Sequence, residues 1–367
     1  MKSLRVIIAG GGTGGHVFPA IAVAEEIKKS RPDADILFIG TQKKIEARVV
    51  PQKGYPFRSI WISGWSRKVR WESLLFPFKV IVAMIQSYTI MKQVKPDVVI
   101  GTGGYVCGPV VRTASYLGIP TVIQEQNSYP GVTTRMLAPK ADRVHITFDE
   151  TRKYLRRTDN VFTSGNPTRN ELDTVSREDA FQKFNFDPER PVVLVFGGSL
   201  GAATINKAVI ASMNVLDDHN IQLLWITGDS MYEEILNKTE RRPDRLIVPF
   251  LDDMASAYAA ATIAICRAGA TTIAELTRTG VPAILVPYPY AAANHQEFNA
   301  RTMADNGAAR MILNANLVDR LPGVLQELFG EPDKLSSMRE KSKTLGKPEA
   351  GKIIAASIID LAERRTS

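Results

Sequence analysis

Short apolar runs alternate with longer segments of helical periodicity along nearly the whole chain. Most of the short runs are continuous stretches of Val, Ile and Leu rather than alternating apolar and polar positions. Continuous runs are typical of parallel strands that helices cover on both faces. The pattern therefore predicts an α/β chain built from strand–helix repeats around parallel sheets. Strands are predicted at Leu4–Ala9, Ile36–Ile39, Asp97–Ile100, Pro120–Ile123 and Arg143–Ile146, and then at Pro191–Phe196, Ile221–Ile226, Arg245–Val248, Ile263–Cys266 and Ala283–Val286.

One strand–loop–helix unit occurs twice, about half a chain apart. RVIIAGGGTGGH, which begins at Arg5, is echoed by VVLVFGGSLGA, which begins at Val192. The repeat favours two similar domains over one large sheet, as does a length of 367 residues. The segment SGNPTRNEL combines glycine, proline and polar residues, so we place the join around Thr163–Leu172. A last helical pattern, Ala350–Arg364, has no strand after it.

Composition and charge narrow the class of protein. Hydrophobic residues make up 44% of the chain, and 46 basic against 38 acidic residues give a net charge of +8. The positive balance predicts an anionic partner, and nucleic acid, anionic lipid and a phosphorylated substrate all qualify. Because no nucleic-acid-binding motif accompanies it, we expect no nucleic-acid partner. Cys107 and Cys266 are predicted to be reduced core residues, which suits a cytoplasmic enzyme, and we expect no secretory signal ahead of the first strand.

Three glycine clusters follow predicted strands. Gly10, Gly12 and Gly15 match the dinucleotide-binding spacing G-x-G-x-x-G, but the next strand ends in Ile39-Gly40-Thr41 without the carboxylate that a nicotinamide ribose requires. The other clusters are Gly101–Tyr105 and Gly197–Gly201. Glycines can serve merely to permit tight turns. Three clusters at the carboxyl ends of strands instead favour a phosphorylated ligand bound by main-chain N–H groups.

The segment CRAGATTIAELTRTGVPAILVPYP, Cys266 to Pro289, predicts a strand, a turn of small residues, a helix and a second buried strand. The turn would expose helix N-terminal N–H groups to a diphosphate, with Thr271 or Thr272 as the cap. One turn later, the Glu275 carboxylate could accept hydrogen bonds from both hydroxyls of a ribose. The alternative is that Glu275 only interacts with the helix dipole.

Taken together, the motifs resemble the MurG family of UDP-N-acetylglucosamine (UDP-GlcNAc) transferases. The resemblance rests on GGGTGGHVFPA, GTGGYVCGPV, QEQNSYPG, SGNPTR, FGGSLGA, FLDDM, CRAGATTIAEL and NHQEFNA, which occur in the family's order. It implies the GT-B architecture, with two Rossmann-like parallel-sheet domains facing a deep cleft. Residues 1–164, completed by the helix at 350–367, would form the acceptor and membrane-facing domain, and residues 165–349 the UDP-GlcNAc-binding domain.

The resemblance also implies the reaction. GlcNAc would pass from UDP-GlcNAc, with inversion, to O4 of the MurNAc-pentapeptide on undecaprenyl diphosphate, for cell-wall synthesis. No cofactor or metal is expected, and we interpret Asp33-Ala34-Asp35 as a solvated turn rather than a metal-binding Asp-x-Asp motif. The alternatives are another GT-B enzyme acting on UDP-GlcNAc, such as a 2-epimerase or a different lipid glycosyltransferase, and a non-catalytic nucleotide-sugar sensor.

The site residues that the resemblance implies fall on the glycine loops and on the second half of the chain. His16 is the preferred general base, because histidine titrates near neutral pH. Glu125 is the alternative base, and we expect Asn127 to orient a substrate rather than to take a proton. Gly103, Gly104 and Tyr105 are assigned to the acceptor diphosphate, and His145 and His219 to structural positions. The donor contacts are expected at Thr13, Gly14, Gly15, Asn127, Arg169, Ser199, Leu251, Ala270, Thr271, Thr272, Ile273, Ala274, Glu275 and Gln296. Some relatives carry two adjacent glutamines where this chain has His295-Gln296, so the resemblance leaves the detail of sugar-hydroxyl recognition there open.

A basic segment remains, RKVRWESLLFPFKVIVAMIQSY from Arg67 to Tyr88, with Trp71 inside it and Trp61 and Trp65 just before it. Pro77, Lys79 and Gln86 interrupt its apolar run, so it is too short to span a bilayer. It predicts a helix that lies in the membrane interface, with aromatic residues at headgroup level and cations on anionic lipid. The predicted contacts are Trp71, Leu75, Phe76 and Phe78, and the expected location is the cytoplasmic face of the bacterial plasma membrane. The alternative is a core helix preceded by a basic loop.

Overall fold

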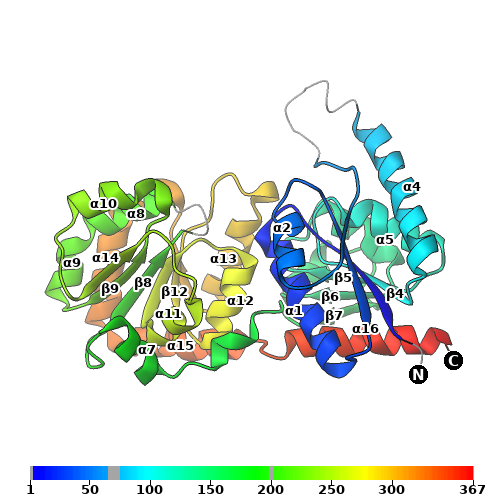
Figure 1. Cartoon of the computed structure of the whole chain (residues 1–367). Coiled ribbons are helices and arrows are strands. Elements are labelled where there is room, and N and C mark those ends of the chain that lie inside the picture. Colours follow the sequence, from blue (N-terminus) through cyan, green and yellow to red (C-terminus); the bar gives the residue numbers. More distant parts are fainter. Residues whose placement is uncertain (1–2, 65–74, 198–201, 367) are drawn as a thin grey trace. The chain divides into compact units, whose positions relative to one another are not determined.

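The computed structural model describes residues 3–64, 75–197 and 202–366. The chain divides into two compact units. Unit 1 comprises Met1–Thr168 with Pro348–Ser367, and unit 2 comprises Arg169–Lys347. Each unit contains one fully parallel sheet with helices on both faces (Figure 1). The two parallel sheets confirm the predicted α/β class.

Unit 1 contains a seven-stranded sheet in the order β3-β2-β1-β4-β5-β6-β7. Its strands are β1 (Arg5–Ala9), β2 (Asp35–Gly40), β3 (Phe57–Ser59), β4 (Val98–Gly101), β5 (Thr121–Glu125), β6 (Arg143–Ile146) and β7 (Val161–Thr163). Its helices are α1 (Gly14–Ser30), α2 (Glu46–Gln52), α4 (Phe76–Val94), α5 (Cys107–Tyr116), α6 (Val132–Leu137) and α16 (Ala350–Thr366), and its 3₁₀ helices are η1 (Ala138–Lys140) and η2 (Asp149–Tyr154).

Unit 2 repeats the plan with six strands in the order β10-β9-β8-β11-β12-β13. Its strands are β8 (Val192–Phe196), β9 (Gln222–Ile226), β10 (Arg245–Val248), β11 (Ile263–Cys266), β12 (Ala283–Leu285) and β13 (Ala309–Met311). Its helices are α7 (Arg177–Phe184), α8 (Ala203–Ala211), α9 (Met213–Asp218), α10 (Tyr232–Lys238), α11 (Met254–Ala260), α12 (Ala270–Thr279), α13 (His295–Asp305), α14 (Leu317–Gly330) and α15 (Pro332–Leu345). Its 3₁₀ helices are η3 (Asn170–Asp173), η4 (Asp229–Met231), η5 (Ala292–Asn294) and η6 (Asn314–Asn316).

All ten predicted strands are present, within one or two residues at their ends. The continuous apolar runs are buried from end to end, as in β4, β8 and β11. Three further strands, β3, β7 and β13, were not predicted from the sequence. Each is three residues long and lies at an edge of its sheet, so it has neither the length nor the continuous burial that the pattern requires.

The last helix, α16, packs in unit 1, beside α1 (Figure 1). Ile354 and Ile358 of α16 are fully buried in the same apolar cluster as Ile27 of α1. Polar contacts also join α16 to the sheet, because Arg143 Nη1 donates to the main-chain oxygen of Ser357 at 2.8 Å. The C-terminal helix is therefore an integral part of the first unit's core.

His145 lies in β6 and contacts α16. Its Nδ1 lies 2.6 Å from Ser164 Oγ and its Nε2 lies 2.9 Å from Ser357 Oγ, and only 2% of its surface is exposed. Burial, aided by the neighbouring positive charge of Arg143, lowers the pKa of His145 to about 4. The imidazole is thus neutral in the folded chain across the pH range in which an unfolded histidine becomes protonated.

This lowered pKa predicts a specific loss of stability in acid. Between pH 6.5 and pH 4, His145 binds a proton in the unfolded chain but not in the folded chain. The free energy of unfolding therefore decreases as the pH falls through that range. From pH 7 to pH 5 the wild type should lose about 2 kcal/mol more of its free energy of unfolding than a His145→Gln variant does. Urea unfolding at both pH values measures the difference. His219→Gln is the control, and equal pH dependences in wild type and His145→Gln would contradict the prediction.

Candidate active site

The topology of unit 1 brings two of the glycine loops together. The strand order reverses between β1 and β4, which pair in parallel over Val6–Ala9 and Val98–Gly101. The loop after β1 leads into α1, and the loop after β4 leads into α5. In open parallel sheets, ligands bind at the carboxyl ends of the strands where the order reverses. We therefore place the candidate active site of unit 1 at this edge.

The two loops are in contact through their glycines. A Cβ atom at position 104 would lie 2.4 Å from the main-chain oxygen of Gly11, and one at position 103 would lie 2.3 Å from His16 Nδ1. Gly103 and Gly104 also have positive φ angles, +109° and +81°. Only glycine permits this close approach. Packing of one loop on the other is therefore a reason for these glycines that does not involve a ligand.

The buried carboxylate of Glu46 is hydrogen-bonded to the first glycine loop. Glu46 Oε2 accepts a hydrogen bond from Gly12 N at 3.0 Å, and Glu46 Oε1 accepts from Thr41 N at 3.0 Å and from Thr41 Oγ1 at 2.7 Å. Only 1% of the residue is exposed. The sequence predicts no carboxylate at the end of β2, and it predicts that the N–H groups of this loop face a ligand. Glu46, five residues after Thr41, reaches back and uses one of them.

A pocket of about 340 Å³ opens beside these loops. His16 is half-buried in its wall, Lys44 adds a positive charge, and Tyr105 adds a phenol whose pKa is raised by burial. The pocket thus combines an imidazole, a cation and glycine-rich backbone, which suits an anionic substrate with a hydroxyl to be deprotonated. It is lined by Gly11, Gly12, Thr13, His16, Lys44, Ser63, Gly64, Gly104 and Tyr105.

Glu125 is the last residue of β5 and Asn127 follows the strand, and neither residue lines this pocket. Glu125 is 3% exposed. Its Oε1 accepts from the main-chain N of Asn127 at 3.1 Å and from Asn127 Nδ2 at 3.2 Å, and its Oε2 accepts from Gly131 N at 3.0 Å. Both oxygens of the carboxylate are therefore held by N–H groups of the segment that follows β5. The geometry therefore favours His16 over Glu125 as the base.

In unit 2 the strand order reverses between β8 and β11. Ser199 follows β8 and lies outside the described residues, while Ala270 to Glu275 begin α12 after β11. The expectation that Thr271 or Thr272 caps α12 was wrong, because Gly269 is the N-cap and no side chain makes a capping hydrogen bond. Thr271 Oγ1 is buried without a hydrogen-bond partner in the part of the chain that the structure describes.

Two of the predicted donor-binding residues, Arg169 and Glu275, form an ion pair. Arg169 Nε donates to Glu275 Oε1 at 3.2 Å, and the Tyr258 hydroxyl donates to Glu275 Oε2 at 2.9 Å. The Glu275 side chain is 6% exposed and that of Arg169 is 43% exposed. Burial raises the pKa of Glu275, whereas Arg169 and the Tyr258 hydrogen bond lower it. Arg169 thus helps to keep a buried carboxylate ionised.

The other residues predicted to contact the donor lie in both units. In unit 2, Leu251 is half-buried after β10, and Gln296 in α13 accepts a hydrogen bond from Tyr288 N at 2.9 Å through Oε1. His295 Nδ1 lies 2.7 Å from the main-chain oxygen of Ala292. The predicted contacts in unit 1 are Asn127 and the beginning of α1, Thr13 to Gly15.

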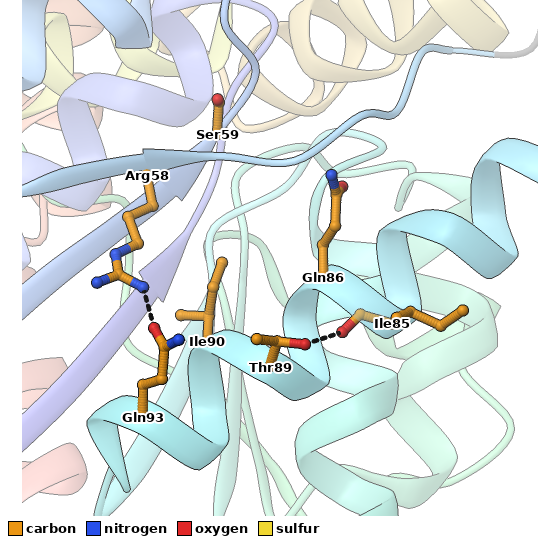
Figure 2. A pocket seen from close by; sticks show the side chains of 7 residues that line it. All are labelled: Arg58, Ser59, Ile85, Gln86, Thr89, Ile90 and Gln93. Atoms are coloured by element: carbon orange, nitrogen blue, oxygen red, sulfur yellow. Dashed lines mark hydrogen bonds between the residues drawn. The ribbon is translucent and has the colours of Figure 1, made fainter.

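A second hollow, of about 390 Å³, lies between β3 and α4 (Figure 2). Arg58 Nη1 donates to Gln93 Oε1 at 2.6 Å, which links β3 to α4. Gln86 Oε1 accepts from Trp61 N at 2.8 Å. The remaining lining residues, Ser59, Ile85, Thr89 and Ile90, bring no acid–base group, and we assign no catalytic function to this hollow.

The helix α4 contains residues 76–88 of the segment predicted to contact membrane, whereas residues 67–74 of that segment lie outside the described residues. It packs against α5 and buries Ala83 and Met91 (Figure 1). Of the predicted contacts, Trp71 lies outside the described residues, Phe76 is half-buried, and Leu75 and Phe78 are 49% and 56% exposed. The exposed side continues along Ile81, Ile85 and Tyr88. Of the helices that the structure describes, none has the length and apolar content needed to cross a bilayer.

Comparisons with known proteins identify the family of the chain. Residues 6–146 match the glycosyltransferase family 28 N-terminal domain, and residues 192–354 match the family 28 C-terminal domain. The chain is 43% identical to the UDP-N-acetylglucosamine–N-acetylmuramyl-(pentapeptide) pyrophosphoryl-undecaprenol N-acetylglucosamine transferase of Caldanaerobacter subterraneus subsp. tengcongensis, over 95% of this chain and 97% of that protein.

Solved structures give the same result. The crystal structure of Acinetobacter baumannii MurG is 30% identical, with a TM-score of 0.77 over 97% of this chain and 99% of that one. A UDP-N-acetylglucosamine 2-epimerase shares the fold, with a TM-score of 0.67 over 100% of this chain and 98% of that one, at only 16% identity. The chain is a family 28 glycosyltransferase and belongs to the MurG family.

Proposed function

We propose that this chain transfers GlcNAc from UDP-GlcNAc to O4 of MurNAc-pentapeptide carried on undecaprenyl diphosphate, with inversion at the anomeric carbon. The product is the β-1,4-linked disaccharide lipid of peptidoglycan synthesis. The observation that carries the proposal is a pocket in which an imidazole, a lysine and two interlocked glycine loops lie at the point of strand reversal. The substrates are those named for the relatives that share the family.

In the proposed reaction, His16 takes the proton of the acceptor hydroxyl. The acceptor oxygen forms a bond to the anomeric carbon while the bond from that carbon to the UDP oxygen breaks, and the electron pair of that bond goes to UDP. Arg169 and the main-chain N–H groups that begin α12 stabilise the charge on the departing diphosphate. The reaction needs no redox cofactor.

We assign the donor to unit 2 and the acceptor to unit 1. Glu275 would hold the ribose, and the buried, unpartnered hydroxyl of Thr271 at the start of α12 supports a polar ligand there. In unit 1, Lys44 and the loop of Gly103, Gly104 and Tyr105 would hold the acceptor diphosphate. The pairing of a cation with glycine-rich backbone is typical of diphosphate sites.

A transfer assay tests the proposal. Purified protein is incubated with radiolabelled UDP-GlcNAc and a short-chain analogue of the lipid-linked MurNAc acceptor, with a chelator present. We expect labelled disaccharide lipid and free UDP. Release of an epimerised UDP-sugar without acceptor, or binding of UDP-GlcNAc without any turnover, would contradict the proposal and support the epimerase or the sensor.

We further propose that α4 attaches the chain to the cytoplasmic face of the bacterial plasma membrane as a peripheral protein. The support is a row of exposed apolar side chains, Phe78, Ile81 and Ile85, spaced so that they share one side of the helix. Trp61 extends the row, since its ring lies edge-on to Phe78 at 6.1 Å, and Lys79 Nζ lies 5.6 Å from the Trp61 ring. Aromatic rings beside a cation suit the headgroup region.

The membrane proposal predicts a change in vesicle binding. Ile81→Asp replaces a 57% exposed apolar side chain by an anion, so binding to anionic phospholipid vesicles should weaken about tenfold. Vesicle co-sedimentation at two salt concentrations measures it, and high salt should weaken binding of the wild type. Ile353→Asp in α16, where the residue is 48% exposed, is the matched control and should bind normally. Equal binding by both variants would overturn the proposal.

A further inference from the structure

A buried glutamine contacts the histidine of the candidate active site. Gln126 follows β5 directly and is 2% exposed. Its Nε2 donates to the main-chain oxygen of Thr102 and to Gln124 Oε1, and its Oε1 lies 3.0 Å from His16 Nδ1. The side chain therefore lies between the backbone of the second glycine loop and the imidazole.

The partners of Gln126 decide which end of its amide faces which group. The main-chain oxygen of Thr102 can only accept a hydrogen bond, so the NH₂ end of Gln126 must face it. The reverse orientation would place two oxygens against each other and lose both donated bonds. Oε1 therefore faces His16 and accepts a hydrogen bond, which requires the hydrogen of the imidazole to be on Nδ1. In the neutral ring, Nε2 then carries the lone pair.

The same order of donors and acceptors continues into the interior of unit 1. Gln124 Nε2 donates to Asn166 Oδ1 at 3.1 Å, and Gln124 is fully buried. His16, Gln126, Gln124 and Asn166 thus form a chain in which each side chain donates to the next. Aligned hydrogen bonds polarise one another, so the chain strengthens the acceptor that faces His16.

From this arrangement we infer that Gln126 is a positioning residue, which holds His16 in the Nδ1–H tautomer and makes Nε2 the basic atom. The part about catalysis rests on the proposed function, in which His16 takes the acceptor proton. The tautomer itself is a property of the unligated protein and can be tested without turnover.

The direct test is NMR of the full chain labelled with ¹⁵N-histidine, at a pH above the imidazole titration. The chain has four histidines, and His16→Gln identifies the signal of His16. We expect wild-type His16 to be protonated on Nδ1. Gln126→Met removes the acceptor at similar size and should shift His16 towards Nε2–H. Gln126→Glu still offers an oxygen to Nδ1, whether ionised or protonated, and should restore the wild-type tautomer.

Turnover provides the second test. Gln126→Met should lower kcat about 10- to 100-fold, because the imidazolium that forms in the reaction loses a hydrogen bond, while KM for UDP-GlcNAc stays within about twofold. Gln126→Glu should recover most of the loss. Gln222→Met is the matched control: Gln222 is equally buried, with its Nε2 donating to the main-chain oxygen of Asp187 in unit 2. It should change neither the tautomer nor kcat.

Two results would overturn the inference: wild-type His16 protonated on Nε2, or an unchanged Nδ1–H signal in Gln126→Met. If Gln126→Met does not fold, the wild-type and Gln126→Glu spectra still decide it, since both must show Nδ1–H. A result in which the tautomer responds as expected but His16→Gln keeps full turnover supports the positioning by Gln126 and contradicts the base role of His16.

Discussion

Replacement of His16 by glutamine is expected to lower kcat for GlcNAc transfer about 10²- to 10⁴-fold, with little change in the affinity for UDP-GlcNAc. A general base acts in the transition state, where the acceptor hydroxyl loses its proton, and contributes little to ground-state binding of the donor. Glutamine has similar reach and can still donate to Gln126 Oε1, which accepts from His16 at 3.0 Å in the wild type. The substitution therefore removes the base and disturbs the loops little.

Single-turnover transfer to the acceptor analogue and calorimetric titration of UDP-GlcNAc separate these two effects. His219→Gln is the matched control, because His219 lies near Phe329 in unit 2, with ring centroids 6.2 Å apart. It should retain wild-type kcat. If His16→Gln turned over within a few-fold of the wild type, the base would have to be another group. Glu125 would then be the next candidate, despite its three N–H partners.

The sequence was sufficient to predict the central strands of both sheets and the edge strand β10, but not the edge strands β3, β7 and β13. Central parallel strands must be apolar on both faces, so β1, β4, β8 and β11 are continuous apolar runs. Edge strands pair on one side only and are partly exposed. Arg58 and Ser59 in β3, for example, are exposed, and no apolar pattern marks them. Their place in the sheet depends on the neighbouring strand rather than on their own composition.

The candidate site was predicted only in part, because only some of its residues carry a local signal in the sequence. Residues on the glycine loops could be found because a run of glycine after a strand is a local signal. Glu46 and Gln126 were missed because their partners lie 34 and 110 positions away in the sequence. One signal for Gln126 was available: Gln124 and Gln126 flank Glu125 at alternate positions, and side chains two apart in an extended segment share a face. Nothing local distinguishes Glu46 from an acidic residue in the first turn of an ordinary helix.

The second large effect is expected at Arg169. We expect Arg169→Met to lower kcat about 10²- to 10³-fold, because the proposed reaction loses the cation that stabilises the departing diphosphate. The ion pair with Glu275 adds a second consequence. Burial already raises the pKa of Glu275, and Arg169 is the strongest influence that lowers it. Without Arg169 the pKa of Glu275 should rise further, so that the carboxyl is protonated at a higher pH than in the wild type.

The ionisation of Glu275 determines how the affinity for UDP-GlcNAc changes with pH. An ionised Glu275 accepts hydrogen bonds from the donor's hydroxyls, and a protonated one accepts them less well. In Arg169→Met, the affinity for UDP-GlcNAc should therefore fall as the pH decreases through the raised pKa, and recover as the pH increases. In the wild type the affinity for UDP-GlcNAc should begin to fall only at a lower pH than in the variant. Calorimetric titration of UDP-GlcNAc between about pH 6 and pH 8.5 measures both curves.

Two further variants separate charge from geometry at this pair. Arg169→Lys keeps the positive charge, so the affinity should remain nearly independent of pH, while kcat still falls because an ammonium lacks the planar fork of a guanidinium. Arg278→Met is the matched control, since Arg278 belongs to α12 and pairs with Asp173 rather than with Glu275. It should show wild-type kcat and a level affinity. A loss of affinity in Arg169→Met that is equal at every pH would mean that Arg169 contacts the donor without controlling the ionisation of Glu275. An unchanged kcat in Arg169→Met would mean that Arg169 does not stabilise the departing diphosphate.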